Sequence, residues 1–378
     1  MRIVVSLLSL RPGRVGGAET YVRALLRHPP AVAGGDELVA VMGREVAAAL
    51  ETPGFRRVVH PAGDLGLVAE RVLEAYTPWR AKALERLFAS LETDVLFFPQ
   101  QSIFPARVAG PAVLTVGDVQ HLFFPDNFGL FDRTFRARVY PRSMERAEHL
   151  IAVSEFTRRT LLERCGVRPG KITVVNHGID LLSDAERETI RPTELVQGPY
   201  LYYPAATYAH KDHESLLRSY AALRRQGVLS ARLVFTGEQT ALWRSRLAKL
   251  VAELGVEGDV VHLGFVPYAE VRRLLTGAEA VVFPTRFEGF GLPVVEAAQF
   301  RRRIVTSRLE VFDEIGVPKR FQIDFADPGQ LRAALETEGV TALEKQPSSW
   351  RETAQRTIDV IRNAALRSAS MRAGSPTP

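Results

Sequence analysis

The chain has one cysteine, Cys165, among its 378 residues. A single thiol excludes an intrachain disulfide and is compatible with a reducing compartment such as the cytosol. No apolar run reaches the roughly 18 residues of a membrane-spanning helix. The start of the chain, MRIVVSLLSLRPG, has no small-residue cleavage site of the kind that follows a signal peptide. We therefore expect a cytoplasmic protein, and peripheral contact with the inner face of the membrane stays open.

Two sequence patterns are also missing. The chain contains no Asp-x-Asp pair, the signature with which many enzymes hold a divalent metal beside a phosphate. It also lacks the clustered basic and aromatic residues of an RNA-recognition sheet. A nucleic-acid partner is therefore not expected, although the basic composition alone would permit one.

Length and composition fit a globular protein of two domains. A chain of 378 residues is long enough for two hydrophobic cores, and 46% hydrophobic with 24% charged residues is ordinary for globular proteins. The net charge of +6 and the pI near 9.6 favour anionic partners. Phosphorylated donors, lipid headgroups and nucleic acid all meet that description, and the charge does not choose among them.

Residues 280–305, AVVFPTRFEGFGLPVVEAAQFRRRIV, contain the pattern around which the chain is organised. The run Val281-Val282-Phe283 predicts a buried strand, and the glycine-rich stretch 288–292 predicts a turn. Pro293 opens a predicted helix, where its missing N–H would have no partner in any case. A glycine turn that leads into a helix presents free backbone N–H groups to an anion.

Two carboxylates, Glu288 and Glu296, flank this predicted anion site with seven residues between them. A carboxylate beside a phosphate is electrostatically unfavourable unless it accepts hydrogen bonds from hydroxyls of the same ligand. Phosphate together with a polyol indicates a nucleotide sugar. The alternative is an ordinary strand–turn–helix connection with both glutamates solvated.

The segment from Glu288 through Gly289-Phe290-Gly291-Leu292-Pro293 to Glu296 resembles the E-x7-E signature of retaining glycosyltransferases of family four, also called glycosyl transferases group 1. The resemblance extends over residues 15–366 and implies the GT-B fold. This is an α/β architecture of two Rossmann-like, doubly wound parallel-sheet domains that face each other across a deep cleft, with a C-terminal helix packing back on the N-terminal domain. We expect an acceptor-side domain at 1–190, a nucleotide-sugar-binding domain at 199–350, the returning helix at 351–367 and a disordered tail at 368–378.

The N-terminal half alternates predicted strands and helices, which is typical of a parallel, doubly wound sheet. Residues 2–8 predict the first strand, and further strands follow at 37–41, 94–98 and 112–116. The loop after the first strand contains Gly16 and Gly17. In the family that this chain resembles, a similar loop lies against the phosphates and sugar of the donor, which implies the same role for this loop. The alternative is a plain tight turn without a ligand.

His121 follows the strand at 112–116, and active sites of parallel sheets lie at the carboxyl ends of strands. Many family members have a His-Asp pair here, whereas this chain has Gly117 before Asp118 and its histidine three residues later. The resemblance implies that His121 contacts the sugar or the acceptor. A structural histidine hydrogen-bonded beneath the loop is the alternative.

Two basic stretches of the N-terminal half lie outside these motifs. Residues 67–91 combine apolar side chains with four basic ones, and a predicted helix further on contains five arginines. A solvated helix face is the usual explanation of such runs. A surface for an anionic acceptor or a membrane is the alternative. The five arginines are Arg133, Arg136, Arg138, Arg142 and Arg146.

The second half begins after a polar segment at 181–199, where we place the domain boundary. Lys211 follows the strand at 200–204, in a turn where its charge suits a diphosphate leaving group. Family members usually have an arginine five residues earlier, and this chain has Ala206. After Glu296, relatives commonly have a Gly-x-Pro turn, and this chain has three arginines at 301–303. We expect these arginines at the surface, and a basic rim for an anionic acceptor is the alternative.

The resemblance implies a retaining transfer of a hexose from a nucleotide-diphosphate sugar, of the GDP-mannose or UDP-hexose type, to a glycan or lipid-linked acceptor. Lys211 and the backbone amides of 289–292 would stabilise the departing diphosphate, so we expect no divalent metal and no cofactor. Glu288 would hold the transferred sugar, and Glu296 the ribose hydroxyls. The expected donor site comprises Gly16, Gly17, Lys211, Gly237, Phe265, Val266, Glu288, Gly289, Phe290, Gly291, Leu292 and Glu296, and the catalytic candidates are Glu288, Lys211 and His121.

Two other functions are compatible with parts of the sequence. A nucleotide-sugar epimerase of the same fold would act without an acceptor and would need more acid and base side chains facing the sugar. A non-catalytic nucleotide or RNA binder would explain the basic pI. The E-x7-E pattern favours the transferase over both.

Overall fold

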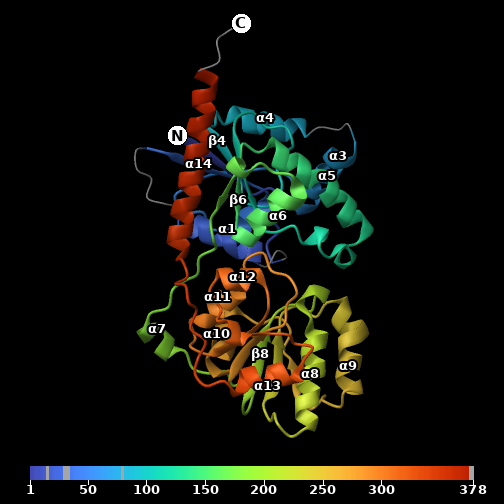
Figure 1. Cartoon of the computed structure of the whole chain (residues 1–378). Coiled ribbons are helices and arrows are strands. Elements are labelled where there is room, and N and C mark those ends of the chain that lie inside the picture. The colour runs from blue at the N-terminus through green and yellow to red at the C-terminus, as the bar shows by residue number, and fades with distance from the viewer. Residues whose placement is uncertain (14–16, 29–34, 78–80, 374–378) are drawn as a thin grey trace. The chain divides into compact units, whose positions relative to one another are not determined.

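A computed structural model describes residues 1–13, 17–28, 35–77 and 81–373. The chain divides into two compact units (Figure 1). Unit 1 comprises Met1–Gly178 together with Ser348–Pro378, and unit 2 is the continuous segment Ile179–Pro347. The chain therefore passes from unit 1 to unit 2 after Gly178. This point precedes the polar segment 181–199, in which the sequence analysis places the domain boundary.

Unit 1 is built on a seven-stranded sheet in which every neighbouring pair is parallel. The strand order is β3-β2-β1-β4-β5-β6-β7. The central strands are continuous apolar runs, as expected for a sheet covered on both faces. The strands are β1 (Arg2–Ser6), β2 (Glu37–Met42), β3 (Arg56–Val59), β4 (Val95–Phe98), β5 (Ala112–Val116), β6 (His149–Ala152) and β7 (Ile172–Val174).

Helices connect and cover these strands. Ser154 caps one of them, because its side chain accepts a hydrogen bond from the Thr157 N–H at 2.9 Å, and Gly166 closes the same helix in a left-handed conformation. The helices of unit 1 are α1 (Gly17–Arg27), α2 (Arg44–Ala49), α3 (Asp64–Tyr76), α4 (Lys82–Ser90), α5 (Leu130–Arg146), α6 (Glu155–Cys165) and α14 (Trp350–Ala373), with 3-10 turns at Gln120–Leu122, Pro125–Asn127 and Pro169–Lys171.

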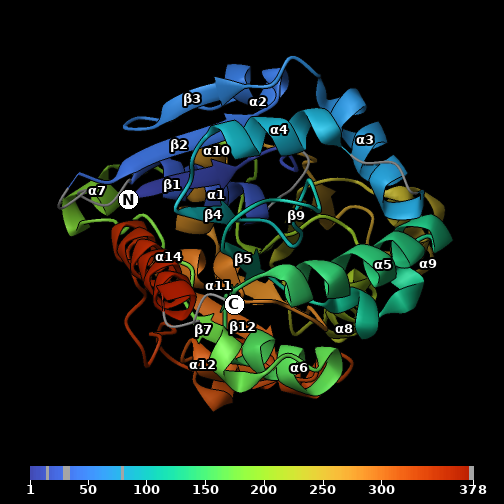
Figure 2. The same cartoon turned by 90° about the horizontal axis from the view of Figure 1, so that it is seen from above.

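Helix α14 returns to unit 1, which confirms that the C-terminal helix packs on the N-terminal domain (Figure 2). It lies against α1 and β4 and buries Ile358 and Ile361. Arg362 adds an ion pair, with its Nε donating to Asp36 Oδ2 at 2.7 Å. The sequence analysis expects disorder from residue 368 onward. The helix instead continues through Ala373, and residues 374–378 lie outside the described part of the chain.

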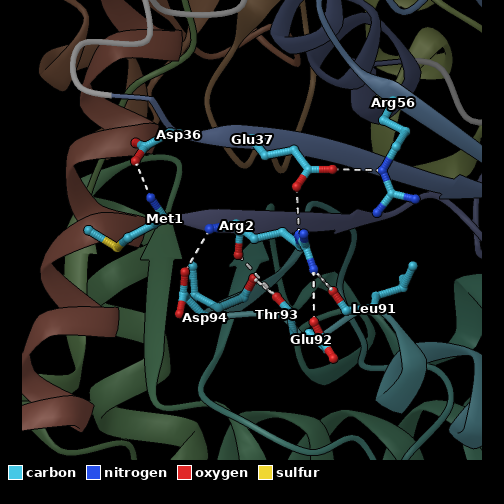
Figure 3. Close-up of polar contacts among 10 residues, drawn as sticks. Met1, Arg2, Asp36, Glu37, Arg56, Leu91, Glu92, Thr93 and Asp94 are labelled. Carbon is cyan, nitrogen blue, oxygen red and sulfur yellow. Dashed lines mark hydrogen bonds and ion pairs between the residues drawn. The ribbon is translucent and has the colours of Figure 1, made fainter.

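Polar contacts hold together the amino ends of four neighbouring strands (Figure 3). Arg2, at the start of β1, donates through Nε to Glu37 at the start of β2 over 2.6 Å. Glu37 also accepts from Arg56 of β3 at 2.7 Å, and the Arg2 backbone N–H donates to Asp94, just before β4. These residues occupy the amino edge of the sheet. The long connections 99–111 and 117–129 leave the opposite edge, at the carboxyl ends of β4 and β5.

Unit 2 contains a second all-parallel sheet, of six strands in the order β10-β9-β8-β11-β12-β13. Two parallel sheets with intervening helices confirm the predicted doubly wound α/β architecture. The strands are β8 (Tyr200–Pro204), β9 (Arg232–Thr236), β10 (Val260–His262), β11 (Ala280–Phe283), β12 (Arg303–Ser307) and β13 (Gln322–Ile323). The helices are α7 (Asp184–Thr189), α8 (His213–Arg225), α9 (Ala248–Glu253) after a π turn at Trp243–Leu247, α10 (Tyr268–Gly277), α11 (Leu292–Ala298), α12 (Glu310–Glu314) and α13 (Pro328–Glu336), with 3-10 turns at Ala209–Lys211 and Lys319–Phe321.

The arginine triplet after α11 forms the turn into β12. Arg301 has a φ of 53°, a left-handed conformation that costs a residue with a Cβ about 1 kcal/mol or more. This is the stretch where relatives commonly have a glycine turn. The Arg301 side chain is exposed and donates to Asp184 at 2.9 Å. Arg303 is the first residue of β12 and is partly buried. The three arginines therefore do not share one exposed rim.

Candidate active site

The predicted strand, glycine turn and helix at 280–298 form as expected. β11 is fully buried and ends before Pro284. Gly291 has a φ of 90° and precedes α11. A Cβ on Gly291 would also approach the Phe312 ring to 3.0 Å, so both the conformation and the packing require glycine there. Pro293 lies in the first turn of α11, which is only seven residues long.

Lys211 lies in the 3-10 turn after β8, and neighbouring elements fix that turn in place. The Tyr203 hydroxyl donates to the Lys211 carbonyl at 2.9 Å. Asp212 adopts a φ of 49° and caps α8, accepting from Ser215. The Arg286 N–H donates to the His210 carbonyl at 2.7 Å. That last bond joins the turn after β8 to the turn after β11, as expected from two adjacent parallel strands.

The joined turns bring two catalytic candidates into direct contact. Lys211 Nζ lies 2.5 Å from Glu288 Oε1. Their side chains are 18% and 15% exposed, so the pair is largely shielded from water. The pair offers an ammonium for an anion beside a carboxylate for hydroxyl donors, which is the combination that a phosphate-linked sugar needs.

Glu296 projects from α11 and has different neighbours. It is half-buried, and burial, reinforced by the negative charge of Asp180, raises its pKa to about 7. A hydrogen bond from the Tyr268 hydroxyl partly opposes this rise. Tyr268 is the first residue of α10 and its own pKa is raised, chiefly by burial. Near neutral pH this carboxyl is therefore present in both its protonated and its ionised form.

The sequence analysis assigned no role to Tyr268 or Asp180. A usable signal existed for Tyr268, because it follows the turn 264–266 at the carboxyl edge of the sheet where the donor site is expected. No motif of the sequence analysis includes Asp180. Both residues belong to unit 2, together with Glu296.

The other candidates of unit 2 lie in the turns after β9 and β10. Gly237 has a φ of 112°, its N–H donates to the Gly264 carbonyl at 2.8 Å, and a Cβ there would meet the Ala206 nitrogen at 2.7 Å. Gly237 thus permits a close backbone approach to the segment that contains Ala206. Phe265 is 88% exposed and Val266 is partly buried.

In the turn after β11, Phe290 and Leu292 are buried and support the turn between them, whereas Gly289 is partly buried.

The glycine loop of unit 1 is described only in part. Gly16 lies outside the described residues. Gly17 is the first residue of α1, and a Cβ there would meet nothing within 4 Å. The described neighbours of Gly17 therefore leave room for a side chain at this position.

His121 belongs to unit 1 and lies in an aromatic setting. It is 9% exposed and contacts Tyr140 and Phe128 edge to face, with ring centroids 5.3 and 6.4 Å away. Burial, and then the Arg136 charge, lowers its pKa to about 4, so the ring is neutral at pH 7. Its Nδ1 is buried and has no hydrogen-bond partner. The burial of His121 is what the structural alternative predicts. The hydrogen bond that this alternative also predicts is missing at Nδ1.

Within the described residues no group of three or more His, Cys, Asp or Glu side chains is placed to hold a metal ion. In the same part of the chain, no helix combines the length and apolar character needed to cross a membrane.

Known proteins resemble this chain over most of its length. The family model described as Glycosyltransferase Family 4 matches residues 15–182, and the model described as Glycosyl transferases group 1 matches residues 186–357. O-antigen chain mannosyltransferase RfbU of Salmonella typhimurium is 24% identical over 205 residues, and the match covers 53% of each chain, so this chain spans about half of that protein. O-antigen chain mannosyltransferase B of Escherichia coli is 24% identical over 274 residues, covering 69% of this chain and 68% of that one.

A solved structure shows the same fold over nearly the whole chain. The structure of Anabaena Alr3699/HepE in complex with UDP-glucose superimposes with a TM-score of 0.64, at 17% identity, covering 98% of this chain and all of that one. Both halves thus match the two models of one family, and both sheets have its parallel arrangement. The chain belongs to glycosyltransferase family four and has the GT-B fold.

Proposed function

We propose that this protein is a retaining glycosyltransferase, one that moves a hexose from a nucleotide-diphosphate sugar to a glycan or lipid-linked acceptor. The observation that carries the proposal is the Lys211–Glu288 pair at the junction of two strand-end turns, with Glu296 on the helix that follows. Two named relatives are O-antigen chain mannosyltransferases, which favours a GDP-mannose type of donor and polysaccharide biosynthesis in the cytoplasm. The UDP-glucose complex of the structural neighbour supports a UDP-hexose as the other donor to test.

Each charged group of the site would serve one part of the donor. The Lys211 ammonium would hold the β-phosphate, where negative charge grows as the bond to the sugar breaks. Glu288, already beside that ammonium, would accept hydrogen bonds from hydroxyls of the transferred hexose. Glu296 would accept both ribose hydroxyls, an arrangement that requires its carboxylate form.

The same groups support a reaction without a divalent metal. A fixed ammonium and the backbone N–H groups of the turn at 289–291 would stabilise the leaving diphosphate. Retention would follow from attack on the face that the diphosphate leaves, with a leaving phosphate oxygen taking the proton of the acceptor hydroxyl. Burial lowers the pKa of His121 to about 4, which makes its ring a weak base, so we assign the proton to the phosphate and no proton transfer to His121.

The test is a binding and turnover panel with UDP-, GDP- and ADP-sugars in EDTA. One donor should raise the melting temperature of the wild type and be hydrolysed slowly, and Glu296→Ala should lose both effects. Glu257→Ala is the matched control, because Glu257 is an exposed glutamate of the same unit. Failure of every nucleotide sugar to bind, or equal binding by Glu296→Ala, would contradict the proposal. Conversion of the donor sugar to its epimer without an acceptor would favour the epimerase.

A further inference from the structure

Helix α3 presents its apolar side chains outward. Leu65 is 87% exposed, Leu73 is 44% exposed and Tyr76 is 38% exposed, and Ala69 lies between them. The spacing of i, i+4, i+8 and i+11 places these four residues on one face of the helix. A surface helix normally has charged side chains on its solvent-facing side, whereas this side of α3 is apolar.

Two charged residues of α3, Arg71 and Glu74, are turned toward the protein instead. Arg71 donates through Nη2 to Ser102 Oγ, and its guanidinium lies over the Phe135 ring at 5.1 Å. Glu74 accepts from the Ala106 N–H at 2.9 Å. None of the charged side chains over 64–76 is in the exposed class. The outward face of α3 therefore has no fully exposed charged side chain among its apolar ones.

Helix α5 lies beside α3 and extends the apolar surface (Figures 1 and 2). Leu130 and Phe131, at its start, are 77% and 61% exposed. The Tyr76 ring lies 5.8 Å from Phe131, and the Tyr76 hydroxyl lies 3.0 Å from Thr134 Oγ1. We use the term α3–α5 apolar face for Leu65, Ala69, Leu73, Tyr76, Leu130 and Phe131.

Exposed arginines border this face along α5. Over residues 130–142 the charged side chains in the exposed class are Arg133, Arg138 and Arg142. Asp132, the acidic residue of this stretch, is paired with Arg136 at 3.0 Å. An apolar surface bordered by arginines, with a tyrosine and a phenylalanine at the junction, matches the interface of a lipid bilayer with anionic headgroups.

We propose that the α3–α5 apolar face docks this protein on the surface of an anionic membrane. The leucines and the phenylalanine would enter the boundary between headgroups and acyl chains, and the arginines would bind the lipid phosphates. A second copy of the chain fits less well, because a two-fold contact through this face would bring both sets of arginines together. The proposal is independent of the donor and the reaction.

The arrangement also bears on how a lipid-linked acceptor would reach unit 1. Helix α5 follows the loop that leaves the carboxyl end of β5, the edge of the sheet where parallel folds bind ligands. Docking through the α3–α5 apolar face would keep that loop close to the bilayer surface. A lipid-linked acceptor would then approach by lateral diffusion.

The test is flotation of the full chain with two kinds of vesicle. One is phosphatidylcholine alone, and the other contains about one third phosphatidylglycerol, a level that gives a strongly negative surface. The wild type should float with the anionic vesicles at low salt. In 0.5 M NaCl, where the Debye length falls to roughly 4 Å, most of it should be released. The variant Leu65→Gln/Leu130→Gln should bind at least about tenfold less, because it removes the two most exposed apolar side chains of the face.

Two further variants make the outcome decisive. Arg133→Glu/Arg142→Glu should lose the preference for anionic vesicles by about tenfold or more. Leu195→Gln/Val340→Gln replaces exposed apolar residues of unit 2, 57% and 51% exposed, and should bind like the wild type. Equal melting temperatures establish that each variant is folded. The proposal is wrong if the wild type does not float, if both leucine pairs behave alike, or if Leu65→Gln/Leu130→Gln dissociates a dimer without changing vesicle binding.

Discussion

Lys211 and Glu288 are 77 residues apart in the chain and form an ion pair of 2.5 Å. Each charge thus has a partner within the protein. A donor that binds here has to replace that partner with its own groups, phosphate for the ammonium and hydroxyls for the carboxylate. The free energy gained from a donor is therefore the difference between two sets of contacts, which favours ligands that supply both.

Removal of one partner should affect stability and turnover differently from removal of both. Lys211→Ala leaves Glu288 shielded and unpaired, which should cost about 1–3 kcal/mol of unfolding free energy and about 10²–10³-fold in donor turnover. Lys211→Met/Glu288→Gln should recover most of the stability and none of the turnover. Urea unfolding and donor hydrolysis measure the two effects, with the exposed Lys249→Ala as control. Full activity in Lys211→Ala would remove Lys211 from the mechanism.

Donor affinity should depend on pH through Glu296. Its pKa of about 7 in the free protein means that the carboxyl is protonated below that pH, and a protonated carboxyl cannot accept from both ribose hydroxyls. Affinity should therefore be constant above pH 7 and fall by up to about tenfold per unit below it. Calorimetric titration between pH 5.5 and 8.5 measures the midpoint. A flat profile would argue against Glu296 as the ribose ligand.

Substitutions of the two neighbours of Glu296 should move that midpoint in opposite directions. Asp180→Asn removes a negative charge that raises the pKa of Glu296, so the midpoint should move to lower pH. Tyr268→Phe removes a hydrogen bond that lowers the same pKa, so the midpoint should move to higher pH. Arg272, the cation that acts on Tyr268, stays unchanged in both variants. Shifts in the same direction would show that the variants act through some other group.

Arg301→Gly should stabilise the protein by about 0.5–1 kcal/mol, since glycine adopts the φ of 53° without a Cβ clash. The exposed ion pair with Asp184 that is lost contributes little. Arg302→Gly, one residue on and without a positive φ, should be neutral or destabilising and serves as the control. Denaturant midpoints measure both. Destabilisation by Arg301→Gly would mean that the arginine side chain contributes more than its backbone conformation costs.

Gly178→Ala should destabilise the protein by about 2 kcal/mol or more. The new Cβ would lie 2.4 Å from the backbone of Ser349 and Trp350, and backbone on both sides has little room to move. Gly170→Ala is the matched control, because a Cβ there would meet nothing within 4 Å. Urea unfolding distinguishes the two, and equal stability of both variants would contradict the close packing at Gly178.

The sequence predicted features that depend on neighbours in the chain. The strand, turn and helix at 280–298 follow from short patterns of β-branched residues, glycine and proline. The contact between Lys211 and Glu288 did not follow, because it depends on which two strands are adjacent in the sheet. The environment of Glu296 was missed for the same reason, since Tyr268 and Asp180 come from separate segments.

The two basic stretches show a different limit of the sequence. Residues 64–76 contain both apolar and charged side chains at helical spacing, and the pattern does not say which face points inward. The structure turns Arg71 and Glu74 inward because each finds a partner there, Ser102 and the Ala106 N–H. Such partners lie about 30 residues away and are known only once the chain is folded.

Unit 2 is one uninterrupted stretch of chain inserted between two parts of unit 1. During synthesis from the N-terminus, all of Ile179–Pro347 emerges before α14 does. Unit 2 can therefore finish folding on the ribosome while unit 1 still lacks the helix that covers Val5, Leu26 and Phe97. The part of the chain that is made first is thus the last to be completed, and its uncovered surface is the one for which a nascent-chain chaperone would compete.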